Sequence, residues 1–456
     1  EMVRAFLLES LRHRPQSRKI RYLGRAIMFQ YGVKLAAVSV LTAATFSLQA
    51  AAETTVVFAG DLVADANSGS SGPSTLVIKD GIITDILPGK DSSIVDHDVT
   101  TIDLSTKTIV PGLIDLHVHL TGDPGGDFWK RTTEPAEWGV VVGAKNALVT
   151  AKAGFTTVRE AGSSQYSAFS LRRGTAEGVI PGPRIVAAGP ALAIVGGHGD
   201  TTGFKEDVNE LLASGYSCTG ANECAQKVRK ASRAGSDIIK ITATGGVLSQ
   251  QGRGLEAHFT DAEMKSIADT AHSLGLKVMA HAHGARGIEA AARAGIDTID
   301  HGTFADEAAL KVMKANGSAL VPTLMAFKGV SERLGKGIYT PVVEDKIRMT
   351  LGRVGKAVTM AKKMGVTVAF GTDAGVFNHG RNAEEFQLMV DAGLTAKEAF
   401  ASGTTVAAKV LGMDKQIGRI AVGYSADMIA VDQNPLDNIR TLENVDWVMV
   451  RGRVID

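Results

Sequence analysis

Cysteine is scarce in this chain, since its 456 residues include only Cys218 and Cys224. No histidine lies close to them in the sequence and no second cysteine pair exists, so a cysteine-based zinc knuckle is not expected. In an oxidising compartment, a closely spaced pair of this kind closes a small disulfide loop. In a cytosolic chain the same two residues would be free thiols.

An excess of either charge is also lacking. Lysine and arginine together number 49, aspartate and glutamate 48, and the net charge is +1. This balance argues against a nucleic-acid partner. Proline is modest at 12 residues whereas glycine reaches 51, which fits an enzyme with many strand-to-helix loops. The length suffices for one large domain and a smaller one.

A long hydrophobic run is the third absence. The apolar stretch at 35–48 is too short to span a bilayer comfortably. Lys34 precedes it and three alanines follow at 50–52, which is the pattern of a secretory signal peptide with its cleavage site. A buried core helix is the alternative interpretation.

We therefore interpret residues 1–52 as an N-terminal extension and signal peptide, of which 1–27 are an upstream extension or a misplaced start. The mature protein is expected to begin near Glu53. We expect it to be exported to the periplasm or secreted, to have no membrane contact after cleavage, and to form a homo-oligomer.

Strands and helices alternate through the middle of the chain. Eight apolar strand candidates alternate with amphipathic helices, which is the count of a closed (β/α)₈ TIM barrel, an α/β fold. The strands are expected at 109–119, 156–159, 184–188, 238–242, 277–281, 298–301, 319–322 and 367–371, and helices for example at 261–274, 285–294, 307–315 and 344–364.

Short β segments flank this region on both sides. They are separated by turn signals, and the two ends of the chain are expected to meet as a small β-sandwich. The predicted domains are therefore residues 53–110 and 412–456 for the two parts of the sandwich, and 111–411 for the barrel.

Polar residues stand at the predicted carboxyl ends of the barrel strands, where the chemistry of such barrels occurs. His117 and His119 are two residues apart on one strand, so both side chains point to the same face. Imidazole is a preferred ligand of zinc and similar divalent metals. The other strands end in His281, His301 and Asp373.

Lys240 lies inside the apolar segment Ile238–Thr242, although lysine is almost never buried without a partner. A salt bridge is one explanation. The other is a carboxylated lysine, whose two anionic oxygens can bridge two cations. Asp373 is suited to carry a proton from the attacking water to the leaving group.

These motifs resemble the amidohydrolase superfamily over essentially the whole mature chain. The resemblance rests on Pro-Gly-Leu-Ile-Asp-Leu-His-Val-His, Asp-Ile-Ile-Lys-Ile, Ala-His-Ala-His-Gly, Asp-His-Gly and Gly-Thr-Asp-Ala-Gly. It implies a metallo-hydrolase with a barrel, a β-sandwich and two Zn²⁺ ions. By this resemblance, one ion is held by His117, His119 and Asp373, the other by His281 and His301, and carboxylated Lys240 bridges them, with His283 a neighbour rather than a ligand.

Three further motifs narrow the group. Thr156-Thr157-Val158-Arg159, Gly196-Gly197-His198-Gly199-Asp200 and Ala243-Thr244-Gly245-Gly246-Val247 are similar to the subgroup of Xaa-Pro and Xaa-Arg/Lys dipeptidases and ochratoxin-hydrolysing amidases. The resemblance implies cleavage of an amide that joins an acyl group to an amino acid with a free carboxylate. Glu160 departs from the pattern, because many relatives have aspartate there.

Three residues are candidates for substrate contact. His198 is the first, as a catalytic group that polarises the scissile carbonyl or as a carboxylate ligand. Tyr216 would contact substrate or serve in packing. Arg159 would bind a carboxylate or, as we favour, brace the barrel through Glu160.

Two other functions stay open. One is a cyclic-amide hydrolase of the imidazolonepropionase type, and the other is a non-catalytic scaffold on the same fold. The scaffold is disfavoured because no expected metal ligand is missing. The expected partner of the enzyme is a small amide or dipeptide.

Overall fold

The structure, a computed structural model, describes residues 54–456 except 126–127, 165 and 251–253. The predicted signal peptide lies outside these residues. The description below concerns the compact unit that begins at Ala50. Within the described ranges no helix is both long enough and apolar enough to cross a bilayer.

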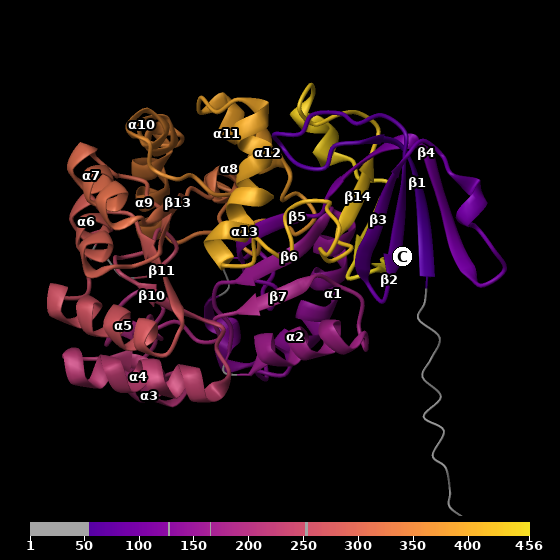
Figure 1. The fold of residues 1–456 in the computed structure, drawn as a ribbon. Helices are drawn as coiled ribbons and strands as arrows, with labels where there is room; N and C mark the ends of the chain where they lie inside the picture. Colours follow the sequence, from indigo (N-terminus) through magenta and orange to yellow (C-terminus); the bar gives the residue numbers. More distant parts are fainter. Residues whose placement is uncertain (1–53, 126–127, 165, 251–253) are drawn as a thin grey trace, which may run out of the picture. The chain divides into compact units, whose positions relative to one another are not determined.

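Seven strands in the middle of the chain run parallel within two sheets (Figure 1). The first sheet has the order β5-β6-β7 and the second β10-β11-β12-β13. All residues of β5 and β6 are buried, as expected for parallel strands covered on both faces. The strands are β5 (Leu113–Val118), β6 (Phe155–Glu160), β7 (Arg184–Ala187), β10 (Ile238–Thr242), β11 (Lys277–Ala282), β12 (Thr298–His301) and β13 (Ala319–Val321).

Backbone hydrogen bonds connect the two sheets. The N–H of Asp237 donates to Ala187 O at 2.9 Å, which joins the end of β7 to the start of β10. On the other side residues 367–374 lie between β13 and β5, because Leu320 N donates to Thr367 O at 2.8 Å and His119 N to Ala374 O at 2.7 Å. Eight segments are thus bonded in sequence order, and we call this arrangement the strand ring.

The eighth segment differs from the prediction. A strand is expected at 367–371, but only isolated bridges form there, at Val368 and Ala374. The reason is local: Asp373 has φ 63° and Gly375 φ 112°, which a regular strand cannot accommodate. A further short pair, β8 (Ala193–Ile194) with β9 (Ser217–Cys218), follows β7.

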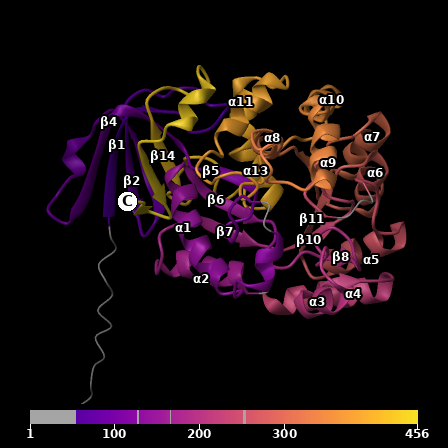
Figure 2. The ribbon, with the colours of Figure 1, turned by 180° about the vertical axis from the view of Figure 1, so that it is seen from behind.

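Helices lie outside the strand ring (Figures 1 and 2). The single helix predicted at 344–364 is wrong, because this region forms two helices, α9 (Pro341–Leu351) and α10 (Lys356–Met364). Residues Gly352–Gly355 interrupt the helix, and Gly355 has φ 79°. The helices are α1 (Trp138–Lys152), α2 (Ser167–Glu177), α3 (Glu206–Leu212), α4 (Ala221–Ala234), α5 (Asp261–Ser273), α6 (Ala285–Ala294), α7 (Glu307–Asn316), α8 (Leu324–Ser331), α9 (Pro341–Leu351), α10 (Lys356–Met364), α11 (Glu384–Asp391), α12 (Ala396–Ser402) and α13 (Thr405–Leu411), with 3₁₀ turns η1 (Ser92–Ile94), η2 (Phe128–Thr132) and η3 (Ile439–Glu443).

The two ends of the chain meet, as predicted, but in one hydrogen-bonded sheet of seven strands. Its edge strand β3 also bonds to the residues ahead of β14, since Ile83 N donates to Tyr424 O at 2.9 Å and Ala426 N to Gly81 O at 2.8 Å. The sheet therefore folds over its own apolar core. Its order is β16 (Arg453–Val454), β15 (Trp447–Val450), β14 (Met428–Val431), β4 (Val99–Pro111), β1 (Thr54–Leu62), β2 (Ser74–Lys79) and β3 (Ile82–Pro88).

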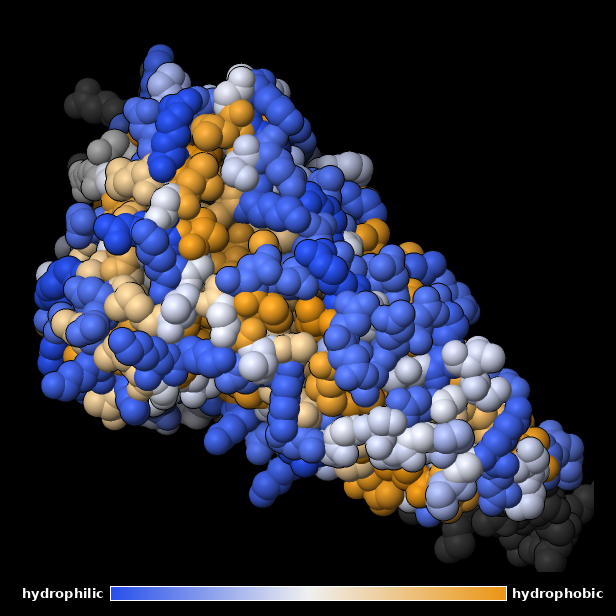
Figure 3. Space-filling view, turned by 90° about the horizontal axis from the view of Figure 1, so that it is seen from above, coloured by the Kyte–Doolittle hydropathy of each residue, from blue (hydrophilic) through white to orange (hydrophobic). Residues whose placement is uncertain are grey.

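Hydrophilic residues cover most of the surface seen from above, and hydrophobic residues show between them (Figure 3). The buried core runs instead through the strand ring and its helices, where it includes Phe155, Phe370 and Phe386. Phe370 stacks on Phe155 with centroids 5.4 Å apart and on Phe386 at 4.2 Å. This packing fixes the strand ends that carry the polar residues.

Candidate metal centre

Two groups of metal-ligand side chains lie at the carboxyl ends of the strand ring. The first consists of His117, His119 and Asp373, and the second of His281, His283 and His301. Within each group the potential ligand atoms all lie within 4.8 Å of one another. The structure therefore brings together all five predicted histidine and aspartate ligands and adds His283 to the second group.

Asp373 is the centre of the first group. Its Oδ1 atom lies 3.4 Å from Nε2 of His117 and 3.3 Å from Nε2 of His119. Burial alone would raise the pKa of the Asp373 carboxyl, but the two imidazoles outweigh it and hold that pKa below its ordinary value. His119 Nδ1 faces Gly162 O at 3.0 Å, so Nε2 is the nitrogen that faces Asp373. Burial alone would lower the pKa of His119, but the Asp373 carboxylate outweighs it and raises that pKa.

The backbone at Asp373 is left-handed, with φ 63°. Such a conformation costs a residue with a Cβ roughly 1–2 kcal/mol, so the surroundings must enforce it. Asp115 does so from β5, because it accepts from Thr372 N at 3.1 Å and from Thr372 Oγ1 at 2.6 Å. Asn382 also donates to Asp115 at 2.8 Å. The loop is thereby held in the one conformation that points Asp373 at the histidines.

The second group is a stack of imidazoles. The ring of His281 lies 4.6 Å from the rings of both His283 and His301, centroid to centroid. Burial is the main cause that lowers the pKa values of all three. They are therefore neutral near pH 7, and each offers one nitrogen lone pair.

Hydrogen bonds fix the orientation of these rings. His281 Nε2 lies 3.2 Å from Gly245 O, so its Nδ1 is left as the acceptor. His301 Nδ1 contacts Thr323 Oγ1 at 2.7 Å. His283 Nδ1 contacts Thr303 Oγ1 at the same distance of 2.7 Å. Both His301 and Thr323 have positive φ, of 70° and 48°.

Lys240 is a buried residue whose charge acts on both groups. Its charge lowers the pKa of His117 in the first group and of His281 and His301 in the second. Burial lowers the pKa of Lys240 itself, partly offset by Asp300, whose Oδ2 atom is 3.4 Å from Nζ. A buried lysine with a lowered pKa has more of the neutral amine that reacts with carbon dioxide.

Asp300 is the residue that sequence reasoning missed. It is fully buried, and besides Lys240 it contacts Nδ1 of His117 at 2.9 Å and a guanidinium nitrogen of Arg159 at 3.2 Å. The only signal was its place before His301 in Asp-His-Gly. One carboxylate thus neutralises the buried cations beneath the site.

Arg159 lies within the strand ring rather than at its mouth. Its side chain is fully buried, and it donates to Leu116 O at 2.5 Å, to Thr298 Oγ1 at 3.1 Å and to Asp300. It therefore braces the ring, but through Asp300 and not through Glu160 as predicted. Its position leaves no donor for a substrate carboxylate.

Glu160 has a separate role. Its Oε2 atom accepts from Leu120 N at 2.6 Å, directly after His119. Burial raises its pKa to about 7. It thus holds the loop that follows β5.

His198 reaches the site, as predicted. Its ring lies 4.3 Å from that of His281, and its Nδ1 atom lies 2.9 Å from Ser249 Oγ. Burial lowers its pKa well below the ordinary value, and the nearby charges of His283 and Lys240 add to this. At neutral pH it is therefore an uncharged imidazole next to the second group.

Lys346 holds the loop that orients His198, and no motif in the sequence indicates this role. It is buried in α9 and donates to Gly246 O at 2.9 Å and Ser249 O at 2.6 Å. Burial lowers its pKa to about 8. The ring of His198 lies against Gly246, where a Cβ would meet it at 2.4 Å.

Tyr216 is fully buried, and Lys230 covers its ring with Nζ 4.4 Å from the centroid. Of the two roles considered for Tyr216, substrate contact and packing, this contact corresponds to packing. The predicted disulfide is present beside it, because Cys218 and Cys224 are joined with their Cα atoms 5.1 Å apart. Both cysteines are buried.

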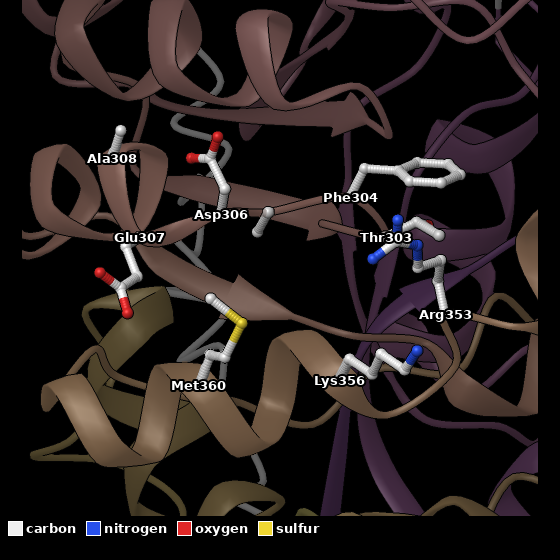
Figure 4. A pocket seen from close by; sticks show the side chains of 9 residues that line it. Thr303, Phe304, Asp306, Glu307, Ala308, Arg353, Lys356 and Met360 are labelled. Carbon is white, nitrogen blue, oxygen red and sulfur yellow. The ribbon is translucent and has the colours of Figure 1, made fainter.

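A hollow of about 600 Å³ opens beside the second group (Figure 4). Thr303, which contacts His283, lies in its wall. Arg353 and Lys356 lie on one side and Asp306 and Glu307 on the other. Neither of these two cations forms an ion pair with a described residue.

The family model described as "Amidohydrolase family" matches residues 108–455, which cover the strand ring and its site. The chain belongs to the amidohydrolase family. Its relatives and its site chemistry together make it a hydrolase that acts on amide bonds.

Three relatives define its neighbourhood within the family. A solved Xaa-Pro dipeptidase with methionine bound in its active site is 38% identical and has a TM-score of 0.82. The match covers 88% of this chain and 99% of the dipeptidase chain. Ochratoxinase of Aspergillus niger is 31% identical over 86% of this chain and 84% of its own length. Imidazolonepropionase of Colwellia psychrerythraea is 27% identical over 74% of this chain and 78% of its own.

The residues present fit the divalent metals of this family. Each group offers at least three imidazole or carboxylate donors, the number that a catalytic zinc site requires. Nδ1 of His117 lies 2.9 Å from Asp300 Oδ2, which leaves Nε2, the nitrogen that faces Asp373, for a metal. The hydrogen bonds of His119 and His281 leave the other ring nitrogen free to coordinate.

Proposed function

We propose that this amidohydrolase holds two Zn²⁺ ions and cleaves dipeptides or N-acyl amino acids that carry a free C-terminal carboxylate. The observation that carries the proposal is the pair of donor groups at the carboxyl ends of the strand ring, together with the buried Lys240 whose charge acts on histidines of both groups. We further propose that the strand ring is the (β/α)₈ barrel of the family and that the folded terminal sheet is its β-sandwich.

His117, His119 and Asp373 would hold one ion, and His281 and His301 the other, with carboxylated Lys240 between them. Carboxylation joins the Lys240 amine to carbon dioxide and releases one proton. Asp300 then retains Arg159 and His117 as partners. Zinc bound there would polarise the scissile carbonyl and lower the pKa of the attacking water.

The chain itself supplies the proton transfer. Asp373 is unprotonated at neutral pH because its pKa lies below the ordinary value, so it can accept the proton of the attacking water. It would then deliver that proton to the departing nitrogen, without which an amine leaves poorly. The enforced backbone of Asp373 keeps its carboxylate in position for both steps.

Recognition of the substrate carboxylate is assigned to groups around the second donor group. Because Arg159 and Tyr216 are buried, the candidates are His198 and the cations Arg353 and Lys356 at the hollow of Figure 4. A hydrogen bond to a charged group contributes about 1.5–3 kcal/mol, which is roughly ten- to a hundredfold in kcat/KM.

The test compares free substrates with their C-terminal amides. We expect the amides to be cleaved at least about tenfold more slowly. Arg353→Gln or His198→Ala should reduce that ratio, and whichever variant does so identifies the carboxylate contact. Lys363→Gln, on the exposed part of α10, is the matched control.

Equal rates on free and capped substrates would contradict the carboxylate proposal. Cleavage of cyclic amides in preference to linear ones would favour the imidazolonepropionase-type reaction instead. Full turnover by protein freed of metal with a chelator would contradict the metal assignment.

A further inference from the structure

A second polar hollow lies at the opposite end of the strand ring from the metal centre. It measures about 480 Å³ and is lined by Arg172, Arg173, Arg184, Arg451 and Asp237, with apolar side chains between them. Arg184 is the first residue of β7 and Asp237 directly precedes β10, so the hollow is at the amino ends of these strands. Three of the four arginines are each paired with a carboxylate, Arg172 with Asp237, Arg173 with Glu177 and Arg184 with Asp427, which leaves Arg451 as the unpaired cation among the described lining residues.

One hydrogen-bond donor of Arg184 has no acceptor in the described part of the protein, whereas Arg172 is bonded to Asp237 and to Gly235 O. Arg184 contacts Asp427 Oδ2 and Ser425 Oγ, both at 3.1 Å, but its Nε atom is buried and has no hydrogen bond within the described residues. Arg172 pairs with Asp237, which also accepts from Ala187 N at 2.9 Å. A buried donor without an acceptor carries a desolvation cost, which an anionic oxygen would remove.

Arg451 has no acceptor at all for its guanidinium among the described residues, although its side chain is half-buried. Its backbone N–H donates to Asp427 Oδ1 at 2.7 Å, which fixes the residue but not the charge. Burial and the neighbouring charges of Arg184 and Arg453 lower its pKa, and the carboxylate of Asp427 offsets this only in part. Asp427 already pairs with Arg184, so positive charge is in excess here.

The backbone at Arg451 is itself unfavourable. Arg451 and Gly452 form the two-residue turn between β15 and β16, with φ of 50° and 75°. Such turns strongly prefer asparagine or aspartate at the first position. The turn between β2 and β3 follows that preference with Asp80-Gly81, at φ of 50° and 77°. Arginine at 451 therefore satisfies no requirement of the turn.

We propose that this hollow binds a small oxyanion of two or more negative charges, of the inorganic phosphate or pyrophosphate type. The planar guanidinium is the side chain best matched to phosphate oxygens. The oxyanion would accept from Arg184 Nε and from Arg451, and would neutralise the excess charge. The site is separate from the metal centre and independent of the proposed reaction.

The test measures thermal unfolding and isothermal titration with phosphate, pyrophosphate and sodium chloride at equal ionic strength. We expect phosphate and pyrophosphate to raise the melting temperature until the site is saturated, and chloride to give no saturable rise. Arg451→Asn should lower the affinity at least about tenfold. Because asparagine suits the turn better, this variant should be no less stable than the parent without anions.

Arg440→Gln is the matched control, since Arg440 is an exposed arginine on η3. Its affinity for pyrophosphate should equal that of the parent. Equal affinity in Arg451→Asn and the parent would overturn the proposal, because it would place the anion at the metal centre or at random surface sites. Stabilisation by chloride equal to that by phosphate would overturn it as well.

Discussion

Oδ2 of Asp300 lies 2.9 Å from Nδ1 of His117, and both side chains are buried. Asp300 also contacts Arg159 at 3.2 Å and Lys240 at 3.4 Å. A carboxylate of this kind orients a ligand histidine and leaves its other nitrogen for the metal. Three buried cationic or ligating groups thus depend on one residue.

Asp300→Asn should therefore weaken metal binding about 10–100-fold and lower the melting temperature, because His117 loses the carboxylate that orients it and Arg159 loses its counter-charge. Chelator competition measures the metal affinity. Asp427→Asn is the control, since Asp427 is an equally buried partner of Arg184 far from the donor groups. It should be destabilised yet bind metal normally. Unchanged metal affinity in Asp300→Asn would contradict the orienting role.

Lys240→Ala should lose the link between the two donor groups. We expect the parent to carry two zinc ions per chain by elemental analysis, and the variant one or fewer with most activity lost. Lys346→Ala, which removes a buried lysine outside the donor groups, is the control for metal content and should keep two ions. Two tightly held ions in Lys240→Ala would disprove the bridge.

Glu385 predicts a particular pH dependence of stability. Its carboxylate accepts from Leu324 N at 2.9 Å and Met325 N at 2.6 Å, and burial raises its pKa from 4.5 to about 8. The folded protein therefore binds this proton more tightly than the unfolded chain. This contribution to stability is complete below pH 4.5 and is lost as the pH rises to about 8.

Between pH 5 and 8.5 the melting temperature of Glu385→Gln should accordingly fall about 5 °C less than that of the parent. The adjacent Glu384→Gln is the control. Arg381 and Lys328 hold the pKa of Glu384 below its ordinary value, so its contribution is lost only in acid. Parallel curves for Glu385→Gln and the parent would show that the carboxyl is ionised throughout.

The disulfide is the third stability prediction. Unfolded, unreduced protein should show no free thiol. Because the loop between Cys218 and Cys224 is short, its closure is worth only about 2 kcal/mol. Cys218→Ser with Cys224→Ser should lower the melting temperature by a few degrees and leave metal content unchanged. Two titratable thiols in the parent would exclude the pair.

The donor set was predictable because it depends on simple periodicity. Side chains two apart on a strand share a face, and parallel strand ends meet at one edge, so His117, His119, His281 and His301 converge. Asp373 was located in the same way, at the expected carboxyl end of the eighth strand. These rules use only local sequence and the order of the strands.

The supporting contacts were not predictable, because they join segments far apart in the sequence. Arg159 meets Asp300 across 141 residues, and Lys346 reaches Ser249 across 97. Hydrophobic patterning says which residues are buried but not which buried charges pair. The break between α9 and α10 was overlooked for a different reason, since helical periodicity continues through Gly352 and Gly355.

Lys346 leads to the last prediction. Its ammonium group donates to the carbonyls of Gly246 and Ser249, and the hydroxyl of Ser249 lies against Nδ1 of His198. A single buried cation therefore holds the loop that sets the position of His198 beside His281. Lys346→Met keeps the volume and the apolar contacts of the stem but leaves two carbonyls without this donor.

We expect Lys346→Met to lower kcat/KM about tenfold while the metal content stays at the parent level, because no donor of either group is touched. Ser249→Ala should cause a smaller loss of the same kind, since it removes only the contact to the ring. Lys363→Met is the matched control, as Lys363 is an exposed lysine on α10. If Lys346→Met lost metal together with activity, the residue would serve the donor groups directly. If it retained full activity, the position of His198 would not limit the reaction.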